Sequence, residues 1–191
     1  MKKLILILMI SSLFAQDSSQ DKTKPMTLNI RGGLDMFGDI QFNYLLQDID
    51  DDLEMGYTLG TELIFIKTNY LNIGIGYEIQ LERELDEMGG KIGFNSFYVE
   101  VESKSGFFTR IGKNNFHGDD TFTSDGYFRL AGSLYTSMGG RFKYNDNSFM
   151  EIAYNSMMGD INWGNDEWMW VEYDTFNISW GYYIDYYPPN N

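Results

Sequence analysis

From Met26 onward, the dominant feature of this chain is an alternation of apolar and polar side chains. In the stretch 71–82, the apolar members are Leu71, Ile73, Ile75, Tyr77, Ile79 and Leu81. The polar or small members between them are Asn72, Gly74, Gly76, Glu78, Gln80 and Glu82. Successive side chains of a β-strand point to opposite faces, so this pattern predicts a strand with one apolar and one polar face.

Seven further stretches show a similar alternation. The eight predicted strands are 26–37, 54–67, 71–82, 91–102, 106–113, 128–144, 148–157 and 172–186. The connections 68–70, 103–105 and 145–147 are short, whereas 38–53, 83–90, 114–127 and 158–171 are long and rich in Gly, Asp and Asn. Short and long connections that alternate are typical of an all-β, eight-stranded antiparallel up-and-down barrel with one tight rim and one looped rim.

The stretch 91–102 departs from a single phase. Ile92 and Phe94 have even numbers, but Phe97, Val99 and Val101 have odd ones. A β-bulge inserts one residue and restores the phase, so we expect a bulge at Asn95-Ser96.

The first residues have the layout of a secretory signal peptide. Lys2 and Lys3 are followed by the apolar run 4–10 and by the small residue Ala15. The run is shorter than the roughly 20 residues of a membrane-spanning helix. We therefore expect a signal peptide at 1–15, a disordered lead-in at 16–25, the barrel at 26–187 and a short tail at 188–191.

Composition excludes several classes of function. The formal net charge is −14, and the predicted leader carries two of the lysines, so a nucleic-acid-binding surface is not expected. The chain has no cysteine and one histidine. Thiolate chemistry and His-rich metal sites are thereby excluded, and we expect no cofactor.

The alternation leaves open which face of the barrel is apolar. A soluble, lipocalin-like barrel in the periplasm would turn it inward around a ligand, and an outer-membrane barrel would turn it toward lipid. Glycines and full charges share the polar face, which favours a narrow, ion-paired lumen. The predicted lumen charges are Arg31, Glu62, Glu78, Glu82, Arg110, Arg129, Arg141, Lys143 and Glu151.

Two segments resemble the small eight-stranded outer-membrane barrels of the OmpA/OmpX-like type. The hairpin 139–151 is similar to that family's Gly-rich strand, Asn-Asp turn and following strand. The last strand carries the positions of its assembly signal, Ser179, Gly181, Ile184 and Tyr186. The resemblance implies a monomer in the cell outer membrane, surrounded by lipid and lipopolysaccharide and inserted by the barrel-assembly machinery. It also implies short periplasmic turns and longer extracellular loops.

Candidate chemistry lies on the side of the long connections. Three acidic groups there could bind Ca²⁺ or Mg²⁺. They are Asp48, Asp50, Asp51, Asp52 and Glu54; Asp119, Asp120 and Asp125; and Asp160, Asp166 and Glu167. His117 lies near Ser124 and Asp119, but their spacing shows no catalytic arrangement. We expect a non-enzymatic barrel whose acidic outer loops have a structural or surface-interaction role. A narrow channel and a lipid-modifying enzyme are the membrane-bound alternatives.

Overall fold

The structure, a computed structural model, describes residues 26–44, 47–85, 90–118, 129–162 and 168–186. These residues form nine strands: β1 (Met26–Tyr44), β2 (Gln47–Asp52), β3 (Gly56–Lys67), β4 (Leu71–Glu84), β5 (Lys91–Ser103), β6 (Phe107–Gly118), β7 (Arg129–Lys143), β8 (Ser148–Asn162) and β9 (Trp168–Tyr186). Within the described residues, no helix is long and apolar enough to cross a membrane. The predicted signal peptide, lead-in and tail lie outside the described residues.

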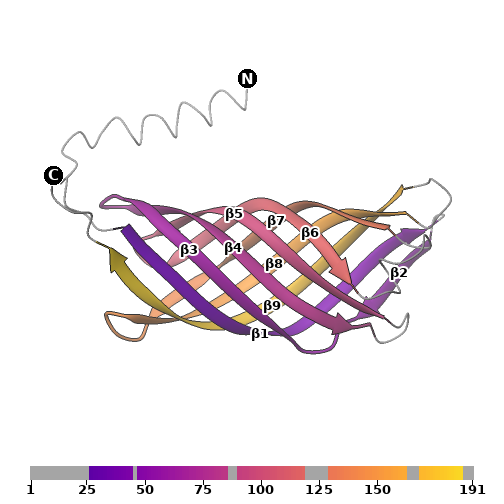
Figure 1. The fold of residues 1–191 in the computed structure, drawn as a ribbon, viewed down its shortest axis with the longest axis horizontal. Helices are drawn as coiled ribbons and strands as arrows, with labels where there is room; N and C mark the ends of the chain where they lie inside the picture. Colours follow the sequence, from indigo (N-terminus) through magenta and orange to yellow (C-terminus); the bar gives the residue numbers. More distant parts are fainter. Residues whose placement is uncertain (1–25, 45–46, 86–89, 119–128, 163–167, 187–191) are drawn as a thin grey trace, which may run out of the picture.

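All the strand pairings are antiparallel, and they close into a barrel (Figure 1). Each strand from β3 to β8 pairs with the strand that follows it in the chain. The last strand, β9, also pairs with β1, from Met26↔Tyr186 to Phe42↔Val171. The first part of β1, Thr27–Asp35, pairs with β3, and its last part, Asp39–Tyr44, pairs with β2. Because β2 and β3 follow one another along the same edge of β1, together they count as one of the eight strands of the barrel. The predicted eight-stranded barrel is confirmed.

The short connections form tight turns at the end of the barrel where β1 begins and β9 ends (Figure 1). Thr68 accepts a hydrogen bond at its side chain from the Leu71 amide, 3.0 Å away. Gly106 follows the turn at 103–105 with a φ of 89°, a conformation that favours glycine. The Asn147 amide donates to Asn145 Oδ1 at 2.9 Å. We refer to this end as the periplasmic end, as the resemblance implies.

At the opposite, outer end, the predicted loops are largely strand. β1 runs to Tyr44 instead of ending at 37, and β6 runs to Gly118 instead of 113. β8 and β9 likewise extend to Asn162 and back to Trp168. The Gly and Asp content of these stretches indicated loops, but the pairing of β1 with both β2 and β9 supplies ladder hydrogen bonds that override this preference. Residues 45–46, 86–89, 119–128 and 163–167 lie outside the described residues.

The apolar face of the strands points outward. On β4, Ile75, Tyr77 and Leu81 are exposed, whereas Glu78 and Gln80 are buried in the lumen. Exposed apolar side chains from other strands include Leu59, Phe97, Ile111, Met138 and Trp180. An apolar surface of this extent is that of a protein surrounded by lipid, as predicted.

The predicted bulge at Asn95-Ser96 is wrong, and the extra residue lies in the neighbouring strand. β5 pairs with β6 without interruption from Ile92↔Gly118 to Glu102↔Phe108. β4 instead shifts register against β5 between Gln80 and Arg83. Both Leu81 and Glu82 therefore point outward, and Arg83 turns into the lumen.

Candidate functional site

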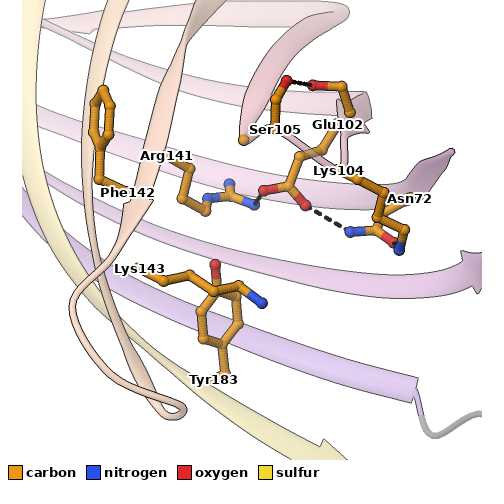
Figure 2. Close-up of a pocket in the computed structure, with 10 residues that line it drawn as sticks. Asn72, Glu102, Lys104, Ser105, Arg141, Phe142, Lys143 and Tyr183 are labelled. Carbon is orange, nitrogen blue, oxygen red and sulfur yellow. Dashed lines mark hydrogen bonds and ion pairs between the residues drawn. The ribbon is translucent and has the colours of Figure 1, made fainter. Parts of the chain in front are cut away.

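The lumen has three levels, and the level nearest the periplasm is a cavity of about 380 Å³ (Figure 2). We call this cavity the vestibule. Its lining comprises Asn72, residues 102–106, residues 141–143 and Tyr183. Lys143 Nζ lies 5.4 Å from the centre of the Tyr183 ring, and Lys104 Nζ donates to Asn72 Oδ1 at 2.7 Å. The vestibule therefore places two lysines at the mouth of the lumen.

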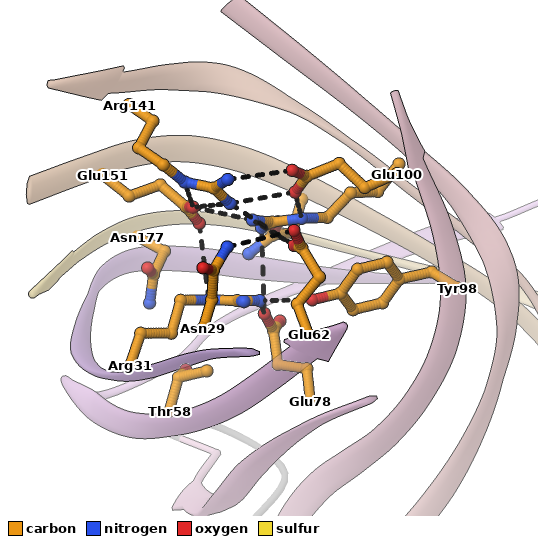
Figure 3. Close-up of polar contacts among 12 residues, drawn as sticks. Asn29, Arg31, Thr58, Glu62, Glu78, Tyr98, Glu100, Arg141, Glu151 and Asn177 are labelled. Carbon is orange, nitrogen blue, oxygen red and sulfur yellow. Dashed lines mark hydrogen bonds and ion pairs between the residues drawn. The ribbon is translucent and has the colours of Figure 1, made fainter. Parts of the chain in front are cut away.

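Above the vestibule lies a closed network of ion pairs, shown in large part in Figure 3. We call it the ionic layer. It consists of Arg31, Glu62, Glu78, Glu100, Glu102, Arg110, Arg141 and Glu151. The residues come from seven barrel strands and from both sides of the lumen. Apart from Glu102 at 8%, their side chains are 0–4% exposed.

Arg141 is the most connected member of the ionic layer. Its Nε donates to Glu151 at 3.1 Å, its Nη1 donates to Glu100 and Glu102 at 3.0 and 3.2 Å, and its Nη2 donates to Glu151 at 2.8 Å. All three nitrogens therefore have carboxylate partners, as a buried guanidinium requires.

Aromatic side chains and glycines shape the space around the ions. Tyr98 is completely buried and accepts a hydrogen bond from Arg31 Nη2 at 2.9 Å. The Arg110 guanidinium lies 4.2 Å from the centre of the Phe108 ring, a favourable cation–π arrangement. A Cβ on Gly76 would overlap the Tyr98 ring. The lumen-facing glycine at position 76 thus makes room for a large side chain from the next strand.

The third level, toward the outer end, combines a cluster of buried apolar side chains with buried polar ones such as Gln80 and Arg83. The members of the cluster, which we call the apolar layer, are Ile40, Leu53, Leu85, Ile92, Phe94, Tyr98, Tyr135, Met157, Val171 and Tyr173. All are at most 7% exposed. Phe94 packs on Tyr173 with ring centres 4.1 Å apart. Tyr98 and Tyr135 also reach the ionic layer through their hydroxyl groups.

The structure places the predicted lumen charges in different surroundings. Arg31, Glu62, Glu78, Arg110, Arg141 and Glu151 are brought together in the ionic layer. Glu82 is exposed on the outer wall, because the bulge in β4 reverses its direction. Lys143 is exposed at the vestibule and forms no ion pair with any described residue. The side chain of Arg129 lies outside the described part of the chain.

Sequence reasoning missed Glu100, Glu102 and Tyr98. A signal for them was present, since these three residues alternate with Phe97, Val99 and Val101, which point outward. The expected bulge concealed the fact that this alternation continues through Phe94 to Ile92.

The positions of the predicted assembly signal lie in β9 and are divided between its two faces. Ser179 and Gly181 face the lumen and are buried, and Ile184 and Tyr186 are about half exposed on the outer wall. Recognition by the assembly machinery stays a prediction.

The candidate metal and enzyme residues are only partly described. Among the described residues, no group of three or more His, Asp or Glu side chains could hold a metal ion. His117 is half-buried at the end of β6. Ser124, Asp119, Asp120, Asp125, Asp166 and Glu167 lie outside the described residues, so a Ser-His-acid arrangement stays untested.

Solved structures with a similar chain path establish the fold class. Ail, the attachment invasion locus protein of Yersinia pestis, is 12% identical with a TM-score of 0.51, over 84% of this chain and 99% of Ail. The outer membrane protein AlkL is 7% identical with a TM-score of 0.52, over 88% and 93% of the two chains. The chain has the fold of a small outer-membrane β-barrel. No family model and no curated protein matches its sequence. This fold, together with the apolar outer wall, agrees with the predicted location in the outer membrane.

Proposed function

We propose that this protein is a non-enzymatic, non-conducting outer-membrane barrel with a structural or surface-interaction role. The observation that carries the proposal is the closure of the lumen by two successive layers. Side chains that line a water-filled pore are accessible to water, but those of the ionic layer, apart from Glu102, are 0–4% exposed. The apolar layer above them is packed as a protein interior.

Single-channel recording in planar lipid bilayers tests whether the lumen is closed. We expect no conductance steps from the folded protein. Insertion is verified separately, because protein recovered from the bilayer should migrate faster on a gel before boiling than after boiling. Silent recordings with this gel shift support the proposal. Stepwise conductance would contradict it and favour the narrow channel.

The outer end of the barrel supports a role at the cell surface. Its outward-facing carboxylates include Asp39, Asp50, Asp52, Glu172 and Asp174. Asp39 pairs with Asp52 on β2 and with Asp174 on β9, so three carboxylates stand side by side on neighbouring strands. An acidic rim of this kind attracts cations and basic partners and repels polyanions.

Labelling of introduced cysteines tests the orientation, and the absence of native cysteine keeps the background low. Asp52→Cys lies at the outer end, and Asp146→Cys lies in the periplasmic turn as its matched control. With a maleimide carried on a large polyethylene glycol, we expect labelling of intact cells only for Asp52→Cys. The reverse result would place the acidic rim in the periplasm and refute the surface role.

A further inference from the structure

The vestibule is lined by several hydrogen-bond donors. Its floor is the Arg141–Glu102 ion pair, in which both groups are engaged: Glu102 accepts from Arg141 at 3.2 Å and from Asn72 at 2.8 Å. The floor is therefore satisfied without a ligand.

Two lysines and several hydroxyl groups surround this floor. Lys143 is exposed, its ammonium lies over the Tyr183 ring, and it has no carboxylate partner among the described residues. Lys104 lies in the turn between β5 and β6, next to the hydroxyls of Ser103 and Ser105. Figure 2 shows the Tyr183 hydroxyl pointing toward Arg141.

Such a cavity is suited to a ligand that supplies acceptors and negative charge. We propose that the vestibule binds a phosphate group, with Lys143 and Lys104 as its cations. Lysine is a common phosphate ligand that acts as a compact point charge. The donors come from three separate walls, the β5–β6 turn, the end of β7 and β9, which fits a tetrahedral group better than a planar carboxylate.

The ionic layer limits the affinity of this site. Together with the floor pair it contains five carboxylates and three guanidinium groups, a formal excess of two negative charges. This excess repels a phosphate, whereas the solvent-accessible Lys104 and Lys143 attract it. We therefore expect weak binding, with a dissociation constant on the order of 1 mM that rises with salt.

The phosphate group could belong to a free phosphate of the periplasm or to a lipid headgroup of the inner leaflet. Backbone amide NMR of the folded protein in dodecyl maltoside distinguishes these sources, because this detergent contains no phosphate. Sodium phosphate is titrated in one arm and dihexanoyl phosphatidylglycerol in the other, both against sodium chloride at equal ionic strength. The reporters are the amides of Lys104, Ser105 and Gly106.

We expect saturable shifts of these three amides with at least one of the two probes. Lys143→Gln should weaken the binding about tenfold, and Tyr183→Phe, which removes only the hydroxyl group, should weaken it less. Lys113→Gln is the matched control, since Lys113 is an exposed lysine on the outer wall of β6. If sodium phosphate shifts these amides, the ligand is a free phosphate. If only the lipid shifts them, the ligand is a lipid headgroup. Absence of shifts with both probes, or equal binding by Lys143→Gln, would overturn the proposal.

Discussion

Arg110 Nη2 lies 2.7 Å from Glu151 Oε2, although the two residues are on strands that are not neighbours. Arg110 is on β6 and Glu151 is on β8, and β7 runs between them. The same carboxylate oxygen also accepts from Arg141 Nη2 on β7 at 2.8 Å. The pair therefore spans three consecutive strands on the lumen face of the sheet.

Glu151→Gln should lower the free energy of unfolding by about 3–5 kcal/mol, because it leaves buried guanidinium groups without their shared anion. The variant keeps the size and shape of the side chain. Urea unfolding in lipid vesicles, followed by tryptophan fluorescence, measures the change. Glu82→Gln is the matched control, since Glu82 lies exposed on the outer wall, and its effect should not be resolved. Equal effects of the two variants would argue against a structural ionic layer.

Gly76→Ala should destabilise the barrel by about 1–3 kcal/mol, because its Cβ would overlap Tyr98 and displace the acceptor of an Arg31 hydrogen bond. Gly32→Ala is the matched control. The Cβ at position 32 would meet Leu59 Cδ2 at 3.6 Å, an ordinary contact. The same unfolding measurement compares the two. If Gly76→Ala is as well tolerated as Gly32→Ala, the lumen is less tightly packed than described.

Phe94→Ala should lower the free energy of unfolding by about 3–5 kcal/mol, as expected for a large side chain removed from a packed interior. Phe94 is 1% exposed, whereas Phe97 on the same strand is 56% exposed and contacts lipid. Phe97→Ala should therefore cost clearly less. A bulge at Asn95-Ser96 would place both rings on the outer wall and make the two losses of stability similar. The urea concentrations at the unfolding midpoints of the two variants therefore show whether Phe94 points into the lumen or outward.

Ile75→Arg should lower stability by about 2–4 kcal/mol, because Ile75 lies near the middle of the apolar outer band of β4. Folding into vesicles should also slow or fail, which a gel with unboiled and boiled samples reveals. Gln41→Arg introduces the same charge at an exposed position of the outer end and should be tolerated. A harmless Ile75→Arg would contradict contact of this face with lipid.

The local sequence pattern was sufficient to predict the direction of a side chain where the two faces of a strand differ in polarity. The alternation in 71–80 predicted the outward direction of Ile75 and the inward direction of Glu78, and the short turns were equally readable. The same pattern failed to predict side-chain direction in the outer half of the barrel, where both faces of a strand carry apolar residues. There Phe94 and Phe97 are indistinguishable by polarity, and the phase had to be inferred from a bulge that the structure places in β4 instead.

The class of fold, the approximate strands and the outward direction of the apolar face follow from the amino-acid sequence, because they depend on a two-residue period that each strand carries alone. The partners of the buried charges follow from the tertiary structure instead. Arg110 and Glu151 come together because β6 and β8 both pair with β7, and Arg31 reaches Glu151 because β9 pairs with β1 and closes the barrel. The members of the apolar layer also depend on the tertiary structure. The bulge in β4 and the extended pairing of β1 with β9 set the direction in which these side chains point.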